Sequence, residues 1–276
     1  MSFDTEGFLS DSLAHRFSQI PECSEWFKLA FQLNRFGHKF AYTEKEFEIE
    51  GNGLSDVKAV TIMLFFRALS NFQGAIALAD RGLLVEARAV ARCCGETALC
   101  MVGAKFDADH WRALIDDEIK SRKGRARLLL GNSHWLTQDQ FEKLTGQIQT
   151  MKTGWKRLSG LDYETIAQKG GVEIHYVIYR QLSADAAHAS LESLFRYLTE
   201  ADGTIESSQP APKLSRDMIS DTVDIACNFF FLCSAVAIEH FPDQTASAAL
   251  EDCWQKYKVL AEKRGASSKQ PSVTNG

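Results

Sequence analysis

The chain has 276 residues, of which 45% are hydrophobic and 24% are charged, so it can bury a sizeable core. Its formal net charge of −5 provides no overall attraction to a phosphate backbone. The seven cysteines are odd in number and form no Cys-x-x-Cys pair, which argues against a disulfide framework and against a cysteine-bound zinc ion. We therefore expect a globular cytoplasmic protein whose cysteines stay reduced.

Apolar residues recur at three- and four-residue spacing along nearly the whole chain, which predicts an all-α fold. We expect one antiparallel bundle of about seven to eight helices, forming a single domain over residues 1–264 with its core at 56–241 and a disordered tail at 265–276. The helices are expected at 21–42, 56–79, 83–105, 107–130, 137–156, 172–198, 216–241 and 245–263, with a short turn at 163–168 and a loop at 203–212.

Several residues predict where these helices begin and how they connect. Ser55 and Ser215 are expected N-caps, and Thr137 with Gln140 forms a capping-box pattern. The turn at residues 80–82 is so short that the helices on either side of it should be antiparallel neighbours.

Two further observations concern membranes. The N-terminus is acidic and lacks the basic and apolar regions of a signal peptide. The longest apolar run, residues 225–238, is interrupted by Asn228 and is shorter than the roughly 20 residues that span a bilayer. We expect this run to be a buried core helix, and we expect no membrane partner.

Charged residues interrupt the apolar pattern of the helix expected at 83–105. Arg92 and Glu96 are four residues apart, so they lie on one helix face and can touch. The cation precedes the anion, which is the weaker order for stabilising an isolated helix, and the neighbouring residues are apolar. We expect a partly buried ion pair or a bridge to another helix. The functional alternative makes Glu96 a base or ligand and Arg92 an anion clamp.

A second polar group falls in the helix expected at 172–198. His175, Tyr179 and Ser183 are spaced by four residues and share one helix face. His188 comes five positions after Ser183, roughly 140° around an unbroken helix, so the two cannot form a local nucleophile and base pair unless the helix breaks. In the structural alternative, Ser183 caps a helix, Tyr179 bonds a neighbouring helix and His188 is an interhelical histidine.

The order of these features along the chain forms a pattern. Its residues are Gly82-Leu83-Leu84-Val85-Glu86-Ala87, then Arg92 and Glu96, then Tyr179, Leu182-Ser183 and His188. This pattern resembles the bacterial helical family catalogued as domain of unknown function 5677, over roughly residues 57–198. In that family three residues usually separate the serine from the histidine, whereas four do so here. The resemblance implies an all-α fold and marks these polar residues, but it implies no reaction because the family has no established activity.

The chain is also distantly similar to helical-bundle modules of prokaryotic defence and toxin systems. Some of these are ribonucleases with an arginine and a histidine four to six residues apart on one helix. Arg127 and His134 have six residues between them, but a glycine-asparagine pair breaks the helix, and Arg180 and His188 have seven between them. A ribonuclease of this kind would work without a metal ion, and His188 would be its general acid or base. Arg92 or Arg180 would bind the phosphate, and Glu96 would orient the catalytic groups.

The remaining motifs concern cofactors and partners. The sequence has no glycine-rich phosphate loop and no His-Glu-x-x-His motif, so we expect no cofactor and no metal. One basic run is expected to be a solvated helix face, with contact to nucleic acid as the alternative. Its cations are Lys120, Arg122, Lys123, Arg125 and Arg127.

Three functions are therefore weighed. The first is a cytoplasmic helical binding or effector module of bacterial defence or stress response, without enzymatic activity. The second is a helical-bundle ribonuclease. The third is a scaffold that forms a homodimer through exposed aromatic residues at 229–231, because three adjacent aromatic side chains cannot all face one side of a helix.

Overall fold

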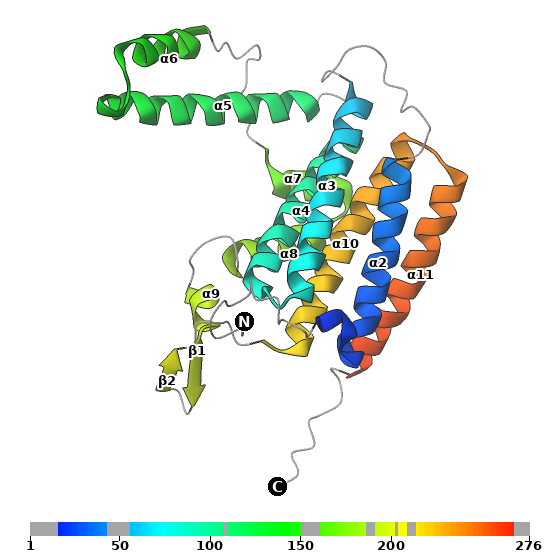
Figure 1. Ribbon diagram of the computed structural model, residues 1–276. Helices are drawn as coiled ribbons and strands as arrows, with labels where there is room; N and C mark the ends of the chain where they lie inside the picture. Colours follow the sequence, from blue (N-terminus) through cyan, green and yellow to red (C-terminus); the bar gives the residue numbers. More distant parts are fainter. Residues whose placement is uncertain are drawn as a thin grey trace.

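The structure, a computed structural model, describes residues 16–42, 56–107, 110–150, 161–185, 191–201, 204–208 and 214–267. These residues form an all-α bundle with one small β-hairpin, so the predicted fold class is confirmed (Figure 1). The elements, with η for a 3₁₀ helix, are η2 (Phe17–Gln19), α2 (Pro21–Ala41), α3 (Val57–Asp80), α4 (Leu84–Phe106), α5 (His110–Gly131), η4 (Ser133–Trp135), α6 (Gln138–Thr150), α7 (Tyr163–Gly170), α8 (Glu173–Asp185), α9 (Leu191–Phe195), β1 (Leu198–Ala201), β2 (Thr204–Ser208), α10 (Arg216–His240) and α11 (Gln244–Ser267).

Ten of the elements in this described part of the chain are α-helices, slightly more than the seven to eight expected. The excess comes from α7 and α9, which have only eight and five residues. α7 was expected as a short turn, and it ends at Gly171, whose φ of 63° lies in the left-handed region that glycine favours.

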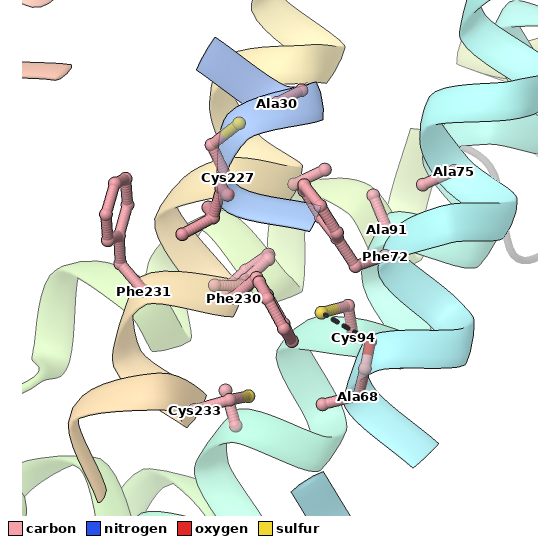
Figure 2. Packing of buried hydrophobic residues seen from close by; sticks show 14 of the residues in the cluster. Ala30, Ala68, Phe72, Ala75, Ala91, Cys94, Cys227, Phe230, Phe231 and Cys233 are labelled. Carbon is pink, nitrogen blue, oxygen red and sulfur yellow. Dashed lines mark hydrogen bonds between the residues drawn. The ribbon is translucent and has the colours of Figure 1, made fainter. Parts of the chain in front are cut away.

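The core is built around α10, which packs against α2, α3, α4 and α11. Its three adjacent phenylalanines point to different layers. Phe229 faces α4, Phe230 stacks on Phe72 of α3 with 4.7 Å between ring centroids, and Phe231 meets Trp254 of α11 at 5.2 Å. Figure 2 shows Phe230 and Phe72 together in this core. All three phenylalanines are buried, so the expectation of exposed aromatics at 229–231 was wrong, and the homodimer hypothesis loses the surface on which it rested.

Two core helices, α3 and α10, are long and apolar enough to cross a membrane by length and composition. In the most apolar window of each helix, 44% of α3 and 61% of α10 is buried inside the bundle. Core helices of globular proteins pass the same test, and α10 is packed as the sequence predicted for residues 225–238.

The helix starts follow from capping side chains. The N-cap of α3 is Asp56, whose carboxylate accepts the backbone N–H two residues later at 2.7 Å; the expected cap, Ser55, lies outside the described residues. The capping box of Thr137 and Gln140 is confirmed by reciprocal bonds of 2.9 and 3.3 Å. Ser215 caps α10 as predicted.

The connection between α3 and α4 needs only three residues because Gly82 adopts a φ of 79°. The two helices lie side by side, as predicted from the short turn (Figure 1).

The segment after α8 differs from the expectation. A helix to residue 198 and a loop at 203–212 were predicted, but β1 and β2 form an antiparallel hairpin that pairs Leu198 with Ser208 and Ala201 with Thr204. The intervening sequence, Asp202-Gly203, is typical of two-residue hairpin turns, and the β-branched residues of both strands favour extended backbone. With strands of four and five residues, the alternation is too short to stand out from the helical pattern.

The last helix also exceeds its predicted length. α11 continues through residues 265–267, which were expected to be part of a disordered tail; residues 268–276 lie outside the described part. Arg264 holds this end of the helix onto α10, because its guanidinium bonds Asp221 at 2.7 Å and Asp224 at 3.1 Å.

α5 and α6 form a helical hairpin that projects from the bundle, and we call it the arm (Figure 1). The first residue of α5, His110, packs its ring against Gly103 of α4. Beyond this point, α3 and residues 111–122 of α5 line a cavity of about 570 Å³. At the far end of the arm, Leu128 and Trp135 are exposed, at 71% and 70% of their surface.

Two helical glycines should respond oppositely to alanine. A Cβ on Gly95 would lie 2.6 to 2.9 Å from the Phe229 ring, whereas a Cβ on Gly124 in α5 would meet nothing within 4 Å. We expect Gly95→Ala to lower the free energy of unfolding by about 1–3 kcal/mol through overpacking. Gly124→Ala should raise it by about 0.5–1 kcal/mol through helix propensity. Urea unfolding measures both, and a stabilised Gly95→Ala variant would contradict the close approach of α4 and α10.

Candidate functional site

Polar side chains from three helices meet on the outer side of α4. α4 contributes Arg92 and Glu96, α8 contributes Tyr179 and Ser183, and α7 contributes Tyr163. We call these five residues the arginine cluster. The i, i+4 spacing within α4 and within α8 places each pair on one helix face, so the two faces can oppose each other.

Arg92 is the centre of the cluster. Its Nε donates to Ser183 Oγ at 2.8 Å, and one terminal nitrogen, Nη2, donates to Tyr179 Oη at 3.0 Å. The other terminal nitrogen, Nη1, lies 3.4 Å from a Glu96 carboxylate oxygen. The guanidinium carbon is also 5.0 Å from the centre of the Tyr179 ring. The predicted ion pair and the predicted bridge to another helix are therefore both present.

The acceptors are themselves held in place. Ser183 Oγ donates to the Tyr179 carbonyl at 2.8 Å, which fixes the serine oxygen in front of Arg92. Tyr163 Oη donates to the second oxygen of Glu96 at 3.3 Å, and the Cys100 thiol lies 3.8 Å from Tyr163 Oη. α7 and α8 are thus both tied to α4 through hydrogen bonds.

Burial sets the protonation of the hydroxyl and thiol groups. It raises the pKa of the Tyr163 and Tyr179 hydroxyls above their ordinary value, and it raises the pKa of the Cys100 thiol to about 12. All three groups keep their protons at neutral pH, so they act as hydrogen-bonding groups and are poor bases or nucleophiles.

The cluster is open to solvent on one side. The Arg92 side chain is 23% exposed and that of Glu96 is 39% exposed. A guanidinium has five N–H donors, and three of those of Arg92 are used within the protein. The Tyr179 side chain is buried, and its hydroxyl lies beside Ser183 as well as Arg92. Two N–H groups of Arg92 therefore remain as donors within the described structure.

The sequence comparison bears on the same part of the chain. Residues 58–205, more than half of the chain, match the Family of unknown function (DUF5677). The chain belongs to this family. The match runs from α3 to β2 and contains the whole arginine cluster, so the resemblance seen in the sequence is confirmed. No curated protein and no solved structure matches the chain.

None of the other predicted polar residues of this DUF5677 member that the structure describes joins the cluster. Arg180 is exposed on α8, and His188 lies outside the described residues. His175 shares the helix face of Tyr179 but is turned to α10, where its ring lies 6.2 Å from that of Phe229. Among the residues that the structure describes, the arginine cluster therefore contains no imidazole.

Two members of the polar network were missed at the sequence level. Cys100 lies four residues after Glu96, so the stripe of Arg92 and Glu96 could have been extended by one helical turn. Tyr163 carried no such signal, because its contact with Glu96 joins residues 67 positions apart.

The predicted basic run lies on α5, in the arm. Arg122 and Arg125 both pair with Glu118, as expected for a solvated helix face. The other three cations of the run form no ion pair with any described residue; they are Lys120, Lys123 and Arg127. α5 ends at Gly131, before His134, so the predicted helix break between Arg127 and His134 is confirmed. Within the described ranges, no group of three His, Cys, Asp or Glu residues is placed to hold a metal ion.

Removing the central cation should weaken the packing of α8 on α4. We expect Arg92→Ala to lower the free energy of unfolding by about 1–3 kcal/mol, because the bonds to Ser183 and Tyr179 are lost while the partly exposed Glu96 is rehydrated. The matched control is Arg180→Ala on the exposed side of α8, which should change this free energy by less than about 0.5 kcal/mol. Urea unfolding compares the two, and equal effects would show that Arg92 contributes nothing beyond a surface charge.

Proposed function

We propose that this DUF5677 member is a helical binding module, and that Arg92, held in place by Tyr179 and Ser183, binds an oxyanion, a carboxylate or phosphate group, of its ligand. The observation that supports this most directly is that two N–H groups of Arg92 are not used by its contacts within the described structure, while its guanidinium is partly exposed. An arginine fork held in this way is suited to a bidentate oxyanion. Because Ser183 and Glu96 orient the guanidinium in advance, little side-chain entropy is lost on binding.

The protonation of the cluster favours binding over catalysis. General acid and base groups work best when their pKa lies near the operating pH, whereas burial moves the pKa of Tyr163, Tyr179 and Cys100 upwards, away from neutrality. The ribonuclease alternative would need His188 to supply the missing proton transfer. We therefore rank it second.

The compartment and pathway remain part of the proposal. The seven cysteines are all free, and six of them are buried among apolar residues, which supports a reducing compartment such as the cytoplasm. From the sequence we also predict a role in bacterial defence or stress response.

Side-chain NMR offers a direct test of the oxyanion site. In the full ¹⁵N-labelled chain, the Nε–H signals of Arg92 and Arg88 are assigned by substitution with lysine and followed during titration with sodium phosphate. We expect a saturable shift of the Arg92 signal and no saturable shift of the Arg88 signal. Arg88 lies one turn earlier on α4, and its guanidinium already bonds Thr222 and Asp221. Tyr179→Phe should raise the apparent dissociation constant roughly tenfold, because the hydrogen bond that holds the Arg92 guanidinium in place is lost.

Sodium chloride at the same ionic strength is the control for screening. Equal shifts of Arg92 and Arg88 with phosphate, or equal shifts with phosphate and chloride, would contradict a specific oxyanion site. An unchanged Arg92 signal with phosphate and with acetate would contradict it as well.

The arm favours an additional candidate function, the binding of single-stranded nucleic acid without cleavage. Lys120, Lys123 and Arg127 have no carboxylate partner among the described residues, and Trp135 is 70% exposed at the end of the same arm. Unpaired cations attract phosphates, and an exposed indole can stack on a base. The arm also projects from the bundle (Figure 1).

Fluorescence anisotropy with a labelled single-stranded RNA tests the arm. We expect replacement of Lys120, Lys123 and Arg127 by glutamine to weaken binding. The negative slope of log K against log salt should become shallower by about 2, the value for three lost phosphate contacts. The control replaces three exposed lysines of the bundle in the same way; they are Lys28, Lys169 and Lys256. An equal loss of RNA affinity in both variants would mean that only the net charge of the protein matters. Cleavage of the RNA by the pure protein would favour the ribonuclease hypothesis.

A further inference from the structure

An apolar groove lies where the arm leaves the bundle. It is the cavity of about 570 Å³ between α3 and α5, and most of its lining is apolar. The side chains that α5 contributes recur at three- and four-residue spacing, so they lie along one side of this helix. They are Trp111, Leu114, Ile115, Glu118, Ile119 and Arg122.

The same side of α5 continues beyond the groove. Arg125 and Leu129 come three and seven positions after Arg122, the last α5 residue of the lining, and we call this whole side of the helix the α5 stripe. Leu129 is 40% exposed, and its neighbour Leu128 is 71% exposed. Leu129 lies about 22 Å along the helix from Leu114, so it cannot fill the groove of its own chain.

The charges of α5 are divided between its two halves. Acidic residues occupy positions 116–118, and the basic run follows at 120–127. Two copies of α5 in parallel would oppose like charges. In an antiparallel pair, the acidic segment of each copy lies beside the basic run of the other, and a two-fold axis makes this favourable contact twice.

The apolar and charged residues of the α5 stripe agree on one register. When Leu129 of one copy lies opposite Leu114 of the other, the residues four positions inward, Arg125 and Glu118, also lie opposite each other. Both of these side chains are exposed. Within one chain, Arg125 Nη2 is 3.5 Å from a Glu118 carboxylate oxygen, so both groups stay accessible to a partner.

We infer that the α5 stripe is an interface between two antiparallel copies of this chain, in which Leu128 and Leu129 of each copy cover the groove of the other. One chain thus supplies both the exposed leucines and the apolar groove that buries them. The surface differs from the buried aromatic segment at 229–231. Lys120 and Arg127, proposed for RNA, lie about 200° and 180° around α5 from Glu118, on its opposite side.

Sedimentation velocity of the full chain over a range of concentrations tests the interface. We expect a reversible dimer. Leu129→Asp should raise its dissociation constant roughly tenfold or more, because a carboxylate would enter the apolar groove. Val259→Asp, at an exposed apolar position of α11 outside the arm, is the matched control and should dimerise like the wild type.

Charge reversal tests the antiparallel register. Glu118→Arg alone places arginines opposite each other in the dimer, and Arg125→Glu alone places glutamates opposite each other. Each variant should therefore dimerise roughly tenfold or more weakly than the wild type. An equimolar mixture of the two variants should dimerise again, because both contacts of the mixed dimer join opposite charges.

Each contrary outcome is specific. A wild type that stays monomeric at every concentration, or a dimer that Leu129→Asp leaves unchanged, would overturn the α5 stripe as the interface. Failure of the mixture to dimerise, when both variants keep the circular dichroism of the wild type, would overturn the register. Release of monomers by single-stranded RNA would make nucleic acid the occupant of the stripe instead. None of these results bears on the phosphate titration of Arg92.

Discussion

One guanidinium group links α7 and α8 to α4. Arg92 on α4 reaches Ser183 and Tyr179 on α8 directly, and it reaches Tyr163 on α7 through Glu96. Only a planar fork with separate nitrogens can hold three partners in three directions, and lysine offers a single point charge instead. The position of α7 and α8 on the bundle is therefore coupled to the chemistry of the same residue that we propose as a ligand contact.

The apolar core depends on close packing around α10. α10 lies between four other helices, and its successive phenylalanines fill three separate layers. Tight contact on one side is possible because Gly95 of α4 leaves room for the ring of Phe229. The match to DUF5677 ends at residue 205, before α10 begins. The matched region thus carries the polar cluster, while the helix that completes its core comes from the following part of the chain.

Local signals predicted the fold well and the site in part. Periodicity and capping residues located the helices, since both act within a few positions, as the capping box at Thr137 shows. Helical spacing also predicted that Arg92 and Glu96 share a face. Three things lay beyond such reasoning: the partner of Glu96 on α7, the burial of Phe229 to Phe231 on all sides, and the β-hairpin after α9. Each is decided by packing between distant segments or by strands too short to show their period.

The arm is long and is supported near one end only. α5 has 22 residues, which gives it a length of about 33 Å at the usual rise of an α-helix. It is supported near its start, where a cavity separates it from α3, and its far end extends into solvent. With that lever, a turn of about 10° at the supported end would carry the far end through about 6 Å. Small changes in how α5 sits on α3 would therefore be magnified into large changes in what the molecule can reach.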